Sequence, residues 1–368
     1  MNREILRKKL SIGHNGTLEF FSIMEKYHEY IGEVYFAPAS WVTPSTRPND
    51  MTSKAEYTEI IKEHMKSAQE KNLNIKFTLL LNSQCWNGEF RSEQLIQKIR
   101  NYIELLEYRF DDIVVSDLFL AKVLKPLMPE KTFTTSVISA LNDVDGCIEF
   151  LKHFSDFETI CVGHKLTYDI SEMKNIKEVT GKKIKLLINQ GCYYHCTDYV
   201  LHSTALAHTG KFFAPVEEGK KLYCDYVNST LDEEAWKNLT HQALSPENIG
   251  YYSDVVDVYK LSTRIESDIN RIDKIIGGYI FGDKNVFAKN LFMGGGRSVS
   301  YDVAAIFSLV EYPKNYIEVR NRCKNRCYKC TYCKTLWDEA VKKFNALNEE
   351  NRPSREMLNF KENVVYVI

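Results

Sequence analysis

The sequence predicts an α/β fold, a TIM-like (β/α)8 barrel with a cysteine-rich C-terminal extension, and three observations favour it. Short apolar runs alternate with longer amphipathic stretches from residue 10 to about residue 265. Eight strand candidates, each followed by a helical pattern, match a parallel barrel better than a doubly wound sheet. The alternation stops beyond residue 278. We therefore expect a barrel over residues 1–278 and an extension over residues 279–368, with an open sheet of fewer strands as the alternative fold.

The expected elements follow from hydrophobic periodicity, taken in chain order. The strands are short runs rich in aliphatic residues, expected at 10–13, 33–37, 74–81, 112–116, 132–137, 158–163, 183–188 and 255–261. The helices carry apolar residues at helical spacing, expected at 18–30, 53–69, 92–107, 118–127, 141–154, 171–180, 199–207, 265–276 and 335–347. Residues 209–248 form an insertion after the seventh strand–helix unit, and such loops commonly carry binding function. The glycine run 294–296 predicts a flexible turn rather than a phosphate loop.

Composition and charge describe an ordinary soluble globular protein. Charged residues make up 26% of the chain, apolar residues 44%, and the net charge is -1. No run approaches the roughly 18 apolar residues of a membrane span, and the first ten residues lack the apolar core of a signal peptide. We therefore expect a cytoplasmic protein with no membrane partner. In that compartment the ten cysteines are expected to include metal ligands rather than disulfides.

Two thiols follow the end of the seventh predicted strand. The apolar run 184–188 breaks at Asn189, and Cys192 and Cys196 come next. Because barrels place their chemistry at the carboxyl ends of the strands, we expect these cysteines to bind a metal or a cluster at the barrel mouth. Cys224, within the predicted insertion, is the nearest third ligand. The fourth ligand stays open among Cys85, His202 and a thiol of the extension, and ordinary turn cysteines are the alternative.

A second group of thiols lies in the extension. Cys323, Cys327, Cys330 and Cys333 fall within eleven residues of a polar and basic segment, whereas core cysteines are scattered. The spacing suits tetrahedral zinc or a cubane iron–sulfur cluster, and flanking Lys and Arg side chains favour the thiolate form. The first three cysteines, with the spacing C-x3-C-x2-C, also match the cluster motif of radical S-adenosylmethionine enzymes. That motif normally follows the first barrel strand, whereas here it follows the whole barrel.

Over roughly residues 10–280 the chain resembles the peptidase U32 family of collagenase-like proteins. The family pattern N-E-G-C-x3-C-P-x-R-x2-H is matched by Asn189, Cys192, Cys196 and His202. A later stretch of the family pattern begins with Ser-Pro-Glu and is matched here at residues 245–247. The two basic residues of that stretch are matched by Lys260 and Arg264. The chain departs from the pattern at three positions, where the family's Glu, Pro and Arg are replaced by Gln190, Thr197 and Tyr199.

The resemblance implies a TIM-like barrel and a cysteine-bound [4Fe-4S] cluster, with oxygen-independent hydroxylation of aromatic rings or RNA bases as the activity. Cys192 and Cys196 would hold the cluster, and a second cluster or a zinc ion in the extension rests on spacing alone. Lys260 and Arg264 would bind an anionic group of the substrate or of a carboxylate oxygen donor. The candidate catalytic residues are therefore Lys260, Arg264, Asn189 and His202.

Two other classes of function stay open. One is the peptidase for which the family is named, although the sequence carries neither HExxH nor GxSxG. The other is a non-enzymatic, zinc-stabilised protein that binds RNA or a protein partner. The three departures from the family pattern leave this alternative open. The substrate expected for an enzyme is an anionic small molecule, an RNA base or a peptide, with a partner subunit or a reductase as a further partner.

Overall fold

The computed structural model describes residues 2–38, 54–84, 86, 92–207, 223–264, 266–283, 299–323, 326–355 and 358. The expected glycine turn at 294–296 and most of the first half of the predicted insertion lie outside these residues.

Eight parallel strands close into a barrel in the order β1-β10-β7-β6-β5-β4-β3-β2. They are β1 (Leu10–Gly13), β2 (Ile31–Phe36), β3 (Lys76–Leu81), β4 (Asp112–Val115), β5 (Thr132–Thr135), β6 (Phe157–Cys161), β7 (Lys183–Leu187) and β10 (Val258–Leu261). Closure is made by β1, which pairs with both β2 and β10. Each strand coincides with an expected run, so the predicted (β/α)8 barrel is confirmed.

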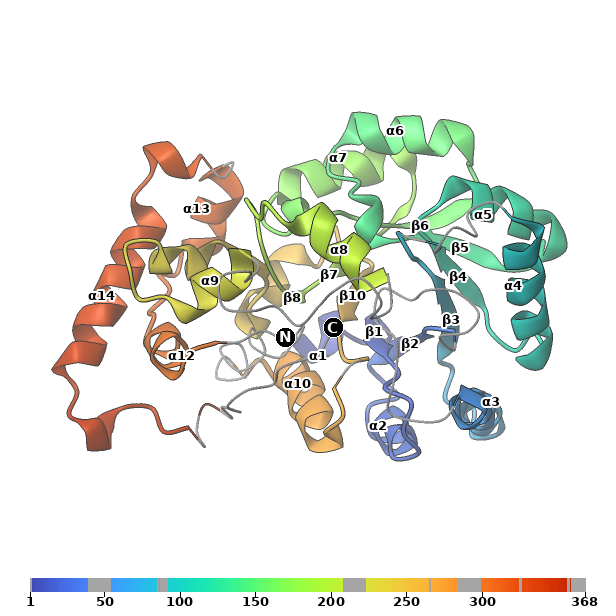
Figure 1. The fold of residues 1–368 in the computed structure, drawn as a ribbon, viewed down its shortest axis with the longest axis horizontal. Coiled ribbons are helices and arrows are strands. Elements are labelled where there is room, and N and C mark those ends of the chain that lie inside the picture. Colours follow the sequence, from blue (N-terminus) through green and yellow to red (C-terminus); the bar gives the residue numbers. More distant parts are fainter. Residues whose placement is uncertain are drawn as a thin grey trace.

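Helices cover the outside of the barrel (Figure 1). The short α1 (Asn2–Ile5) precedes β1, and the helices between or after the strands are α2 (Phe20–Lys26), α3 (Lys54–Glu70), α4 (Glu93–Leu105), α5 (Leu118–Leu124), α6 (Val144–His153), α7 (Ile170–Thr180) and α10 (Ile269–Phe281). Several begin where a side-chain oxygen accepts a backbone N–H, as Ser92 does for α4 and Asp117 for α5. Their apolar faces join the strands in one continuous core.

The chain between β7 and β10 departs from the simple alternation. It contains β8 (Asn189–Tyr193), α8 (Tyr199–Ala207), α9 (Tyr223–Ser229), the 3-10 helix η4 (Ala235–Thr240), β9 (His241–Ala243) and the 3-10 helix η5 (Pro246–Tyr252). β8 and β9 pair antiparallel in a small second sheet. The predicted end of the barrel strand before Asn189 is confirmed, since β7 ends at Leu187, but the predicted turn at 189–191 is wrong, because this segment forms a second strand whose partner lies far along the chain.

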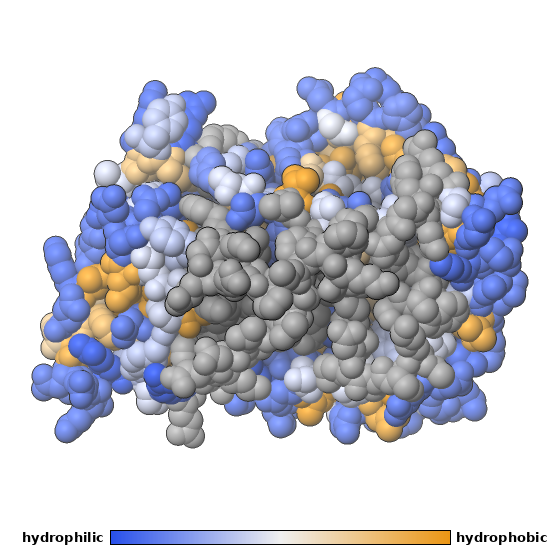
Figure 2. Space-filling view, in the orientation of Figure 1, coloured by the Kyte–Doolittle hydropathy of each residue, from blue (hydrophilic) through white to orange (hydrophobic). Residues whose placement is uncertain are grey.

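The extension contributes α12 (Tyr301–Ser308), α13 (Tyr316–Cys323), the 3-10 helix η6 (Cys327–Lys329), α14 (Tyr332–Ala346) and the 3-10 helix η7 (Glu349–Asn351). α14 packs against η4 and α12, and Trp337 and Phe344 on α14 belong to the same core as the barrel. Figure 1 shows these helices beside α9, on the side of the molecule away from β3 and β4. In Figure 2 hydrophobic residues gather over α14 on an otherwise mainly hydrophilic described surface. Within the described ranges, no helix has the length and apolar character needed to cross a membrane.

Candidate functional site at the barrel mouth

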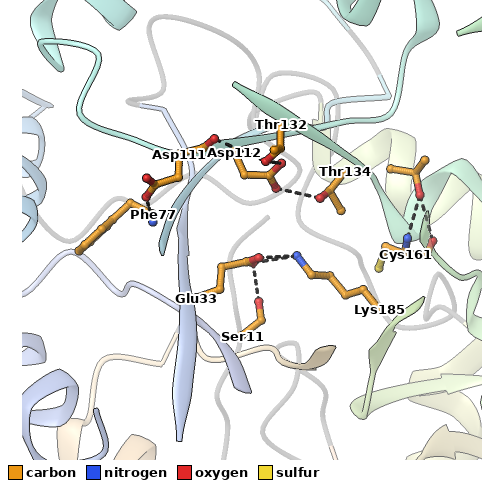
Figure 3. Close-up of polar contacts among 10 residues, drawn as sticks. Ser11, Glu33, Phe77, Asp111, Asp112, Thr132, Thr134, Cys161 and Lys185 are labelled. Carbon is orange, nitrogen blue, oxygen red and sulfur yellow. Dashed lines mark hydrogen bonds and ion pairs between the residues drawn. The ribbon is translucent and has the colours of Figure 1, made fainter. Parts of the chain in front are cut away.

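The inside of the barrel carries charge, where barrels usually carry branched aliphatic side chains. Figure 3 shows Glu33 of β2 and Lys185 of β7 pointing toward one another across the interior. The Lys185 Nζ lies 2.8 Å from both carboxylate oxygens of Glu33, and the Ser11 hydroxyl donates to the same carboxylate at 2.7 Å. Burial alone would raise the pKa of Glu33, but the Lys185 ammonium outweighs it and holds that pKa below its ordinary value. The pair is therefore ionised and mutually neutralising.

A second buried carboxylate, Asp112 of β4, lies in the same network. Its two oxygens accept the hydroxyls of Thr132 at 2.7 Å and Thr134 at 2.8 Å (Figure 3). Burial raises the pKa of Asp112, an effect that Lys185 opposes. Asp112 and Glu33 also line a cavity of about 230 Å³ at the amino-terminal end of the strands. That end of a barrel usually serves stability, so we assign it no chemistry.

Two predicted cations, Lys260 and Arg264, lie toward the carboxyl ends of the strands. The Lys260 Nζ sits 4.2 Å from the centre of the Tyr35 ring, and both cations are less than a tenth exposed. Burial lowers the pKa of Lys260 to about 8, and the Arg264 guanidinium contributes in the same direction. Burial also lowers the pKa of Arg264. The structure thus brings the two predicted cations together in a desolvated pair.

Asn189, another predicted site residue, joins the two sides of the mouth. Its side-chain nitrogen donates to the Ser262 carbonyl at 3.3 Å, and its side-chain oxygen accepts the Ser262 N–H at 2.7 Å. The residue is 1% exposed. Both groups of its amide are therefore engaged in holding the start of β8 against the segment that leads from Lys260 to Arg264.

The three thiols predicted for the mouth lie on β8 and its surroundings. Cys192 is on β8 and half-buried, Cys196 follows it, and Cys224 lies on α9 and is 2% exposed. Cys196 packs against the small cluster formed by Tyr193, Cys224 and Val227. As the side chains lie, the described residues include no group of three His, Cys, Asp or Glu that could hold a metal ion.

Tyr199, which replaces the family's arginine, stands beside these thiols. Burial raises the pKa of Tyr199, and the thiols of Cys192 and Cys196 act in the same direction. Its ring stacks on His164 with the centroids 4.0 Å apart. His164 is 2% exposed, and neither ring nitrogen has a hydrogen-bond partner in the described part of the chain. Burial lowers the pKa of His164 to about 4, so a neutral imidazole faces the thiol-bearing segment.

His202, the fourth predicted catalytic residue, lies on α8, where its backbone N–H donates to the Asp198 carbonyl at 2.7 Å. It is half-buried. Cys85, one of the alternatives for a fourth thiol ligand, lies outside the described residues, as does His208.

The four cysteines of the extension, which we call the tail quartet, line one small pocket together with Arg320. Burial raises the pKa of Cys333 to about 11 and also raises that of Cys327. The expectation that basic neighbours would favour thiolates is therefore wrong for these two residues, because desolvation outweighs the nearby Arg320.

Several notable residues were missed from the sequence. The buried pair Glu33 and Lys185 had a signal, since charges in the middle of apolar strands are unusual. Arg320 had none, because its contacts with Leu239 and Tyr168 join segments far apart in the chain.

Comparison with known proteins adds one full-length relative. No protein-family model matches the chain. An uncharacterized protease from Methanocaldococcus jannaschii is 23% identical over 361 residues, which cover 90% of this chain and 98% of that protein. A solved U32 peptidase shares 13% identity at a TM-score of 0.48, over 69% of this chain and 91% of that one. An O-GlcNAc hydrolase mutant from Thermobaculum terrenum shares 10% identity at a TM-score of 0.40, over 94% and 79%.

Proposed function

Because the chain resembles the U32 peptidases, a resemblance that the comparisons confirm, we propose that it is an enzyme that modifies its substrate at the barrel mouth with an iron–sulfur cluster. The reaction proposed is oxygen-independent hydroxylation, or a related modification, of an RNA base, an aromatic ring or a peptide. The observation that carries the proposal is the position of Cys192 on β8, because Asn189, at the start of that strand, is hydrogen-bonded to Ser262, which lies between Lys260 and Arg264.

The donor chemistry of the mouth fits a thiolate-bound group. Cys192, Cys196 and Cys224 would supply three sulfur ligands once binding draws them together, and Cys196 already packs against the small cluster to which Cys224 belongs. When bound, a [4Fe-4S] cluster supplies one-electron redox chemistry. The protein's own part is to hold the thiols in place, and the half-buried Tyr199, whose ring stacks on the buried His164, lies beside Cys192 and Cys196.

Lys260 and Arg264 bind the anionic group of the substrate or of a carboxylate oxygen donor. Burial is the main reason why the pKa of Lys260 falls to about 8, and repulsion by the neighbouring cations Lys185 and Arg264 adds to it. An entering carboxylate or phosphate relieves that repulsion and restores the ordinary preference of Lys260 for its charged form. The two cations should therefore make the mouth bind anionic groups in preference to neutral ones.

The test is metal analysis of the full-length protein after strictly anaerobic purification. We expect about four irons and four acid-labile sulfides per chain, with broad visible absorption, and loss of all three in Cys192→Ala. Cys147→Ala removes a buried thiol on α6 that takes no part in the proposed site, and it is the matched control that keeps the chromophore. Unchanged iron and absorption in Cys192→Ala would refute the assignment.

The second candidate function is a collagenase-like peptidase, favoured by the name of the full-length archaeal relative. Incubation of the metal-replete protein with denatured collagen and peptide libraries separates the two functions. Cleavage that persists in Cys192→Ala would favour the peptidase and leave the cluster without a role in catalysis.

A further inference from the structure

We propose that the tail quartet binds a single zinc ion as a tetrathiolate, and that the buried guanidinium of Arg320 compensates part of the negative charge of this centre. The site is separate from the barrel mouth and does not depend on the function proposed for the mouth. The site binds a divalent metal ion, and its role is to stabilise the packing of the extension against the barrel.

The fold of the extension brings the four cysteines to the lining of one pocket. Cys323 is the last residue of α13, Cys327 is the first of η6, Cys330 follows η6, and Cys333 lies in the first turn of α14. The Cys330 N–H donates to the Cys327 carbonyl at 3.2 Å, which turns the chain back on itself. All four residues line one pocket of about 30 Å³.

Arg320 lines the same pocket and is 2% exposed. Its Nη1 donates to the Leu239 carbonyl at 2.7 Å and to the Tyr316 hydroxyl at 2.9 Å, and its guanidinium lies 4.0 Å from the centre of the Tyr168 ring. Its Nη2 is buried and has no hydrogen-bond partner among the described residues. An uncompensated buried charge costs several kcal/mol, on the order of the stability of a domain.

None of these partners of Arg320 carries a negative charge. Burial raises the pKa of both Tyr168 and Tyr316, so the two phenols are neutral. Four thiolates around Zn²⁺ carry a net charge of about -2. Their sulfur atoms are stabilised by hydrogen-bond donors and positive charge nearby, and the guanidinium of Arg320 offers both. A zinc-bound quartet would therefore supply the negative charge that the buried Arg320 lacks, and Arg320 would supply the positive charge that the quartet lacks.

The spacing of the quartet, with three, two and two residues between successive cysteines, suits a tetrahedral zinc ion bound by the four thiols alone. As the thiols lie, they do not yet form a metal-holding group within the described residues. Zinc binding must draw them inward to about 2.3 Å from the ion. Cys330 is exposed and the other three are partly exposed, so their side chains have room to rotate.

The first experiment measures zinc, iron and sulfide in the full-length protein expressed with both metals supplied. We expect about one zinc per chain in the wild type and its loss in Cys327→Ser/Cys330→Ser, with iron unchanged. Cys192→Ala should lose iron and sulfide and keep its zinc, which separates this site from the proposed cluster. Cys147→Ala should keep both metals. Absence of zinc in the wild type, retention of zinc in the double variant, or loss of iron and sulfide from that variant would each overturn the proposal.

The second measurement needs no variant and so does not depend on whether the double variant folds. X-ray absorption at the zinc edge of the wild-type protein should show four sulfur neighbours at about 2.3 Å. Nitrogen or oxygen atoms in the first shell would overturn the tetrathiolate.

Arg320→Met tests the guanidinium. Loss of a second-shell partner should weaken zinc affinity by about 10- to 100-fold, measured by competition with a chromophoric chelator. Arg322→Met is the matched control, because it removes the same charge from an exposed position on the same helix. Equal affinities in the two variants would show that Arg320 does not act on the metal.

Discussion

At the scale of single residues, the charges inside the barrel are the least expected feature. Parallel strands buried on both faces normally form continuous apolar runs. Here β2 and β7 contribute Glu33 and Lys185, which are about as buried as the aliphatic residues around them. Such a pair is costly to desolvate, and its stability depends on each partner being present. A mid-strand charge in a parallel strand is therefore a sequence signal for an interior polar network.

Glu33→Gln should destabilise the protein by about 3–5 kcal/mol, because it leaves the Lys185 ammonium buried without its partner. Urea unfolding measures the change. Glu158→Gln is the control, since Glu158 also pairs with a lysine of β7, Lys183, but both side chains are at least one-third exposed. That exposed pair should contribute about 0–1 kcal/mol. Similar losses in both variants would mean that Asp112 compensates Lys185 when Glu33 is neutral.

At the scale of elements, α3 is joined to the end of β1 by two histidines. The His14 Nε2 and the His64 Nδ1 are 2.8 Å apart, and the Gly16 N–H donates to the His14 Nδ1 at 2.9 Å. The latter contact places the proton of His14 on Nε2, so that it donates to His64. Burial lowers the pKa of His64 to about 4 and that of His14 well below its ordinary value.

This pair should make stability depend on pH below neutrality. Both rings are neutral in the folded protein but titrate near 6.5 when unfolded, so the unfolded state takes up protons first. The stabilisation is complete above about pH 6.5 and is lost as the pH falls toward 4, with a loss of about 3 kcal/mol from His64.

Urea midpoints between pH 7.5 and 4.5 check the effect. His64→Gln should reduce this dependence without abolishing it, because burial also lowers the pKa of His164 to about 4, whereas the control His28→Gln, at an exposed position of the chain, should leave it unchanged. A wild-type slope that His64→Gln does not alter would show that other groups cause it.

Elements also show where prediction from sequence succeeds and where it fails. The eight barrel strands could be located because each is a local apolar run that needs no knowledge of its partner. β8 could not, because its Asn-Gln-Gly start has the composition of a turn and its partner β9 lies about fifty residues later. For the same reason, motif spacing placed Asn189 at the mouth but did not reveal that its side-chain amide is hydrogen-bonded to the backbone of Ser262.

At the scale of the whole molecule, the barrel and the extension share one hydrophobic core. Trp337 on α14 is 3% exposed and belongs to that core, together with residues of the barrel helices. We therefore expect the extension and the barrel to unfold together rather than in separate steps.

Trp337→Ala should lower the stability of the entire protein by about 3–5 kcal/mol, since it empties a large buried volume. Near- and far-ultraviolet circular dichroism during urea unfolding should report one transition at a lower midpoint. Tyr328→Ala, which removes an aromatic ring that is 80% exposed on η6, should change stability by less than about 0.5 kcal/mol. An additional early transition in Trp337→Ala, with the main midpoint unchanged, would contradict a common core.

The hydrogen bond from Arg320 to the Leu239 carbonyl has a consequence for the mouth as well. Leu239 lies in η4, which leads directly into β9, and His241 of β9 is opposite Tyr193, the neighbour of Cys192. The two groups of thiols are thus connected through one short ribbon of backbone. A side chain of the extension thus helps to fix the position of the strand that pairs with β8, the strand that carries Cys192.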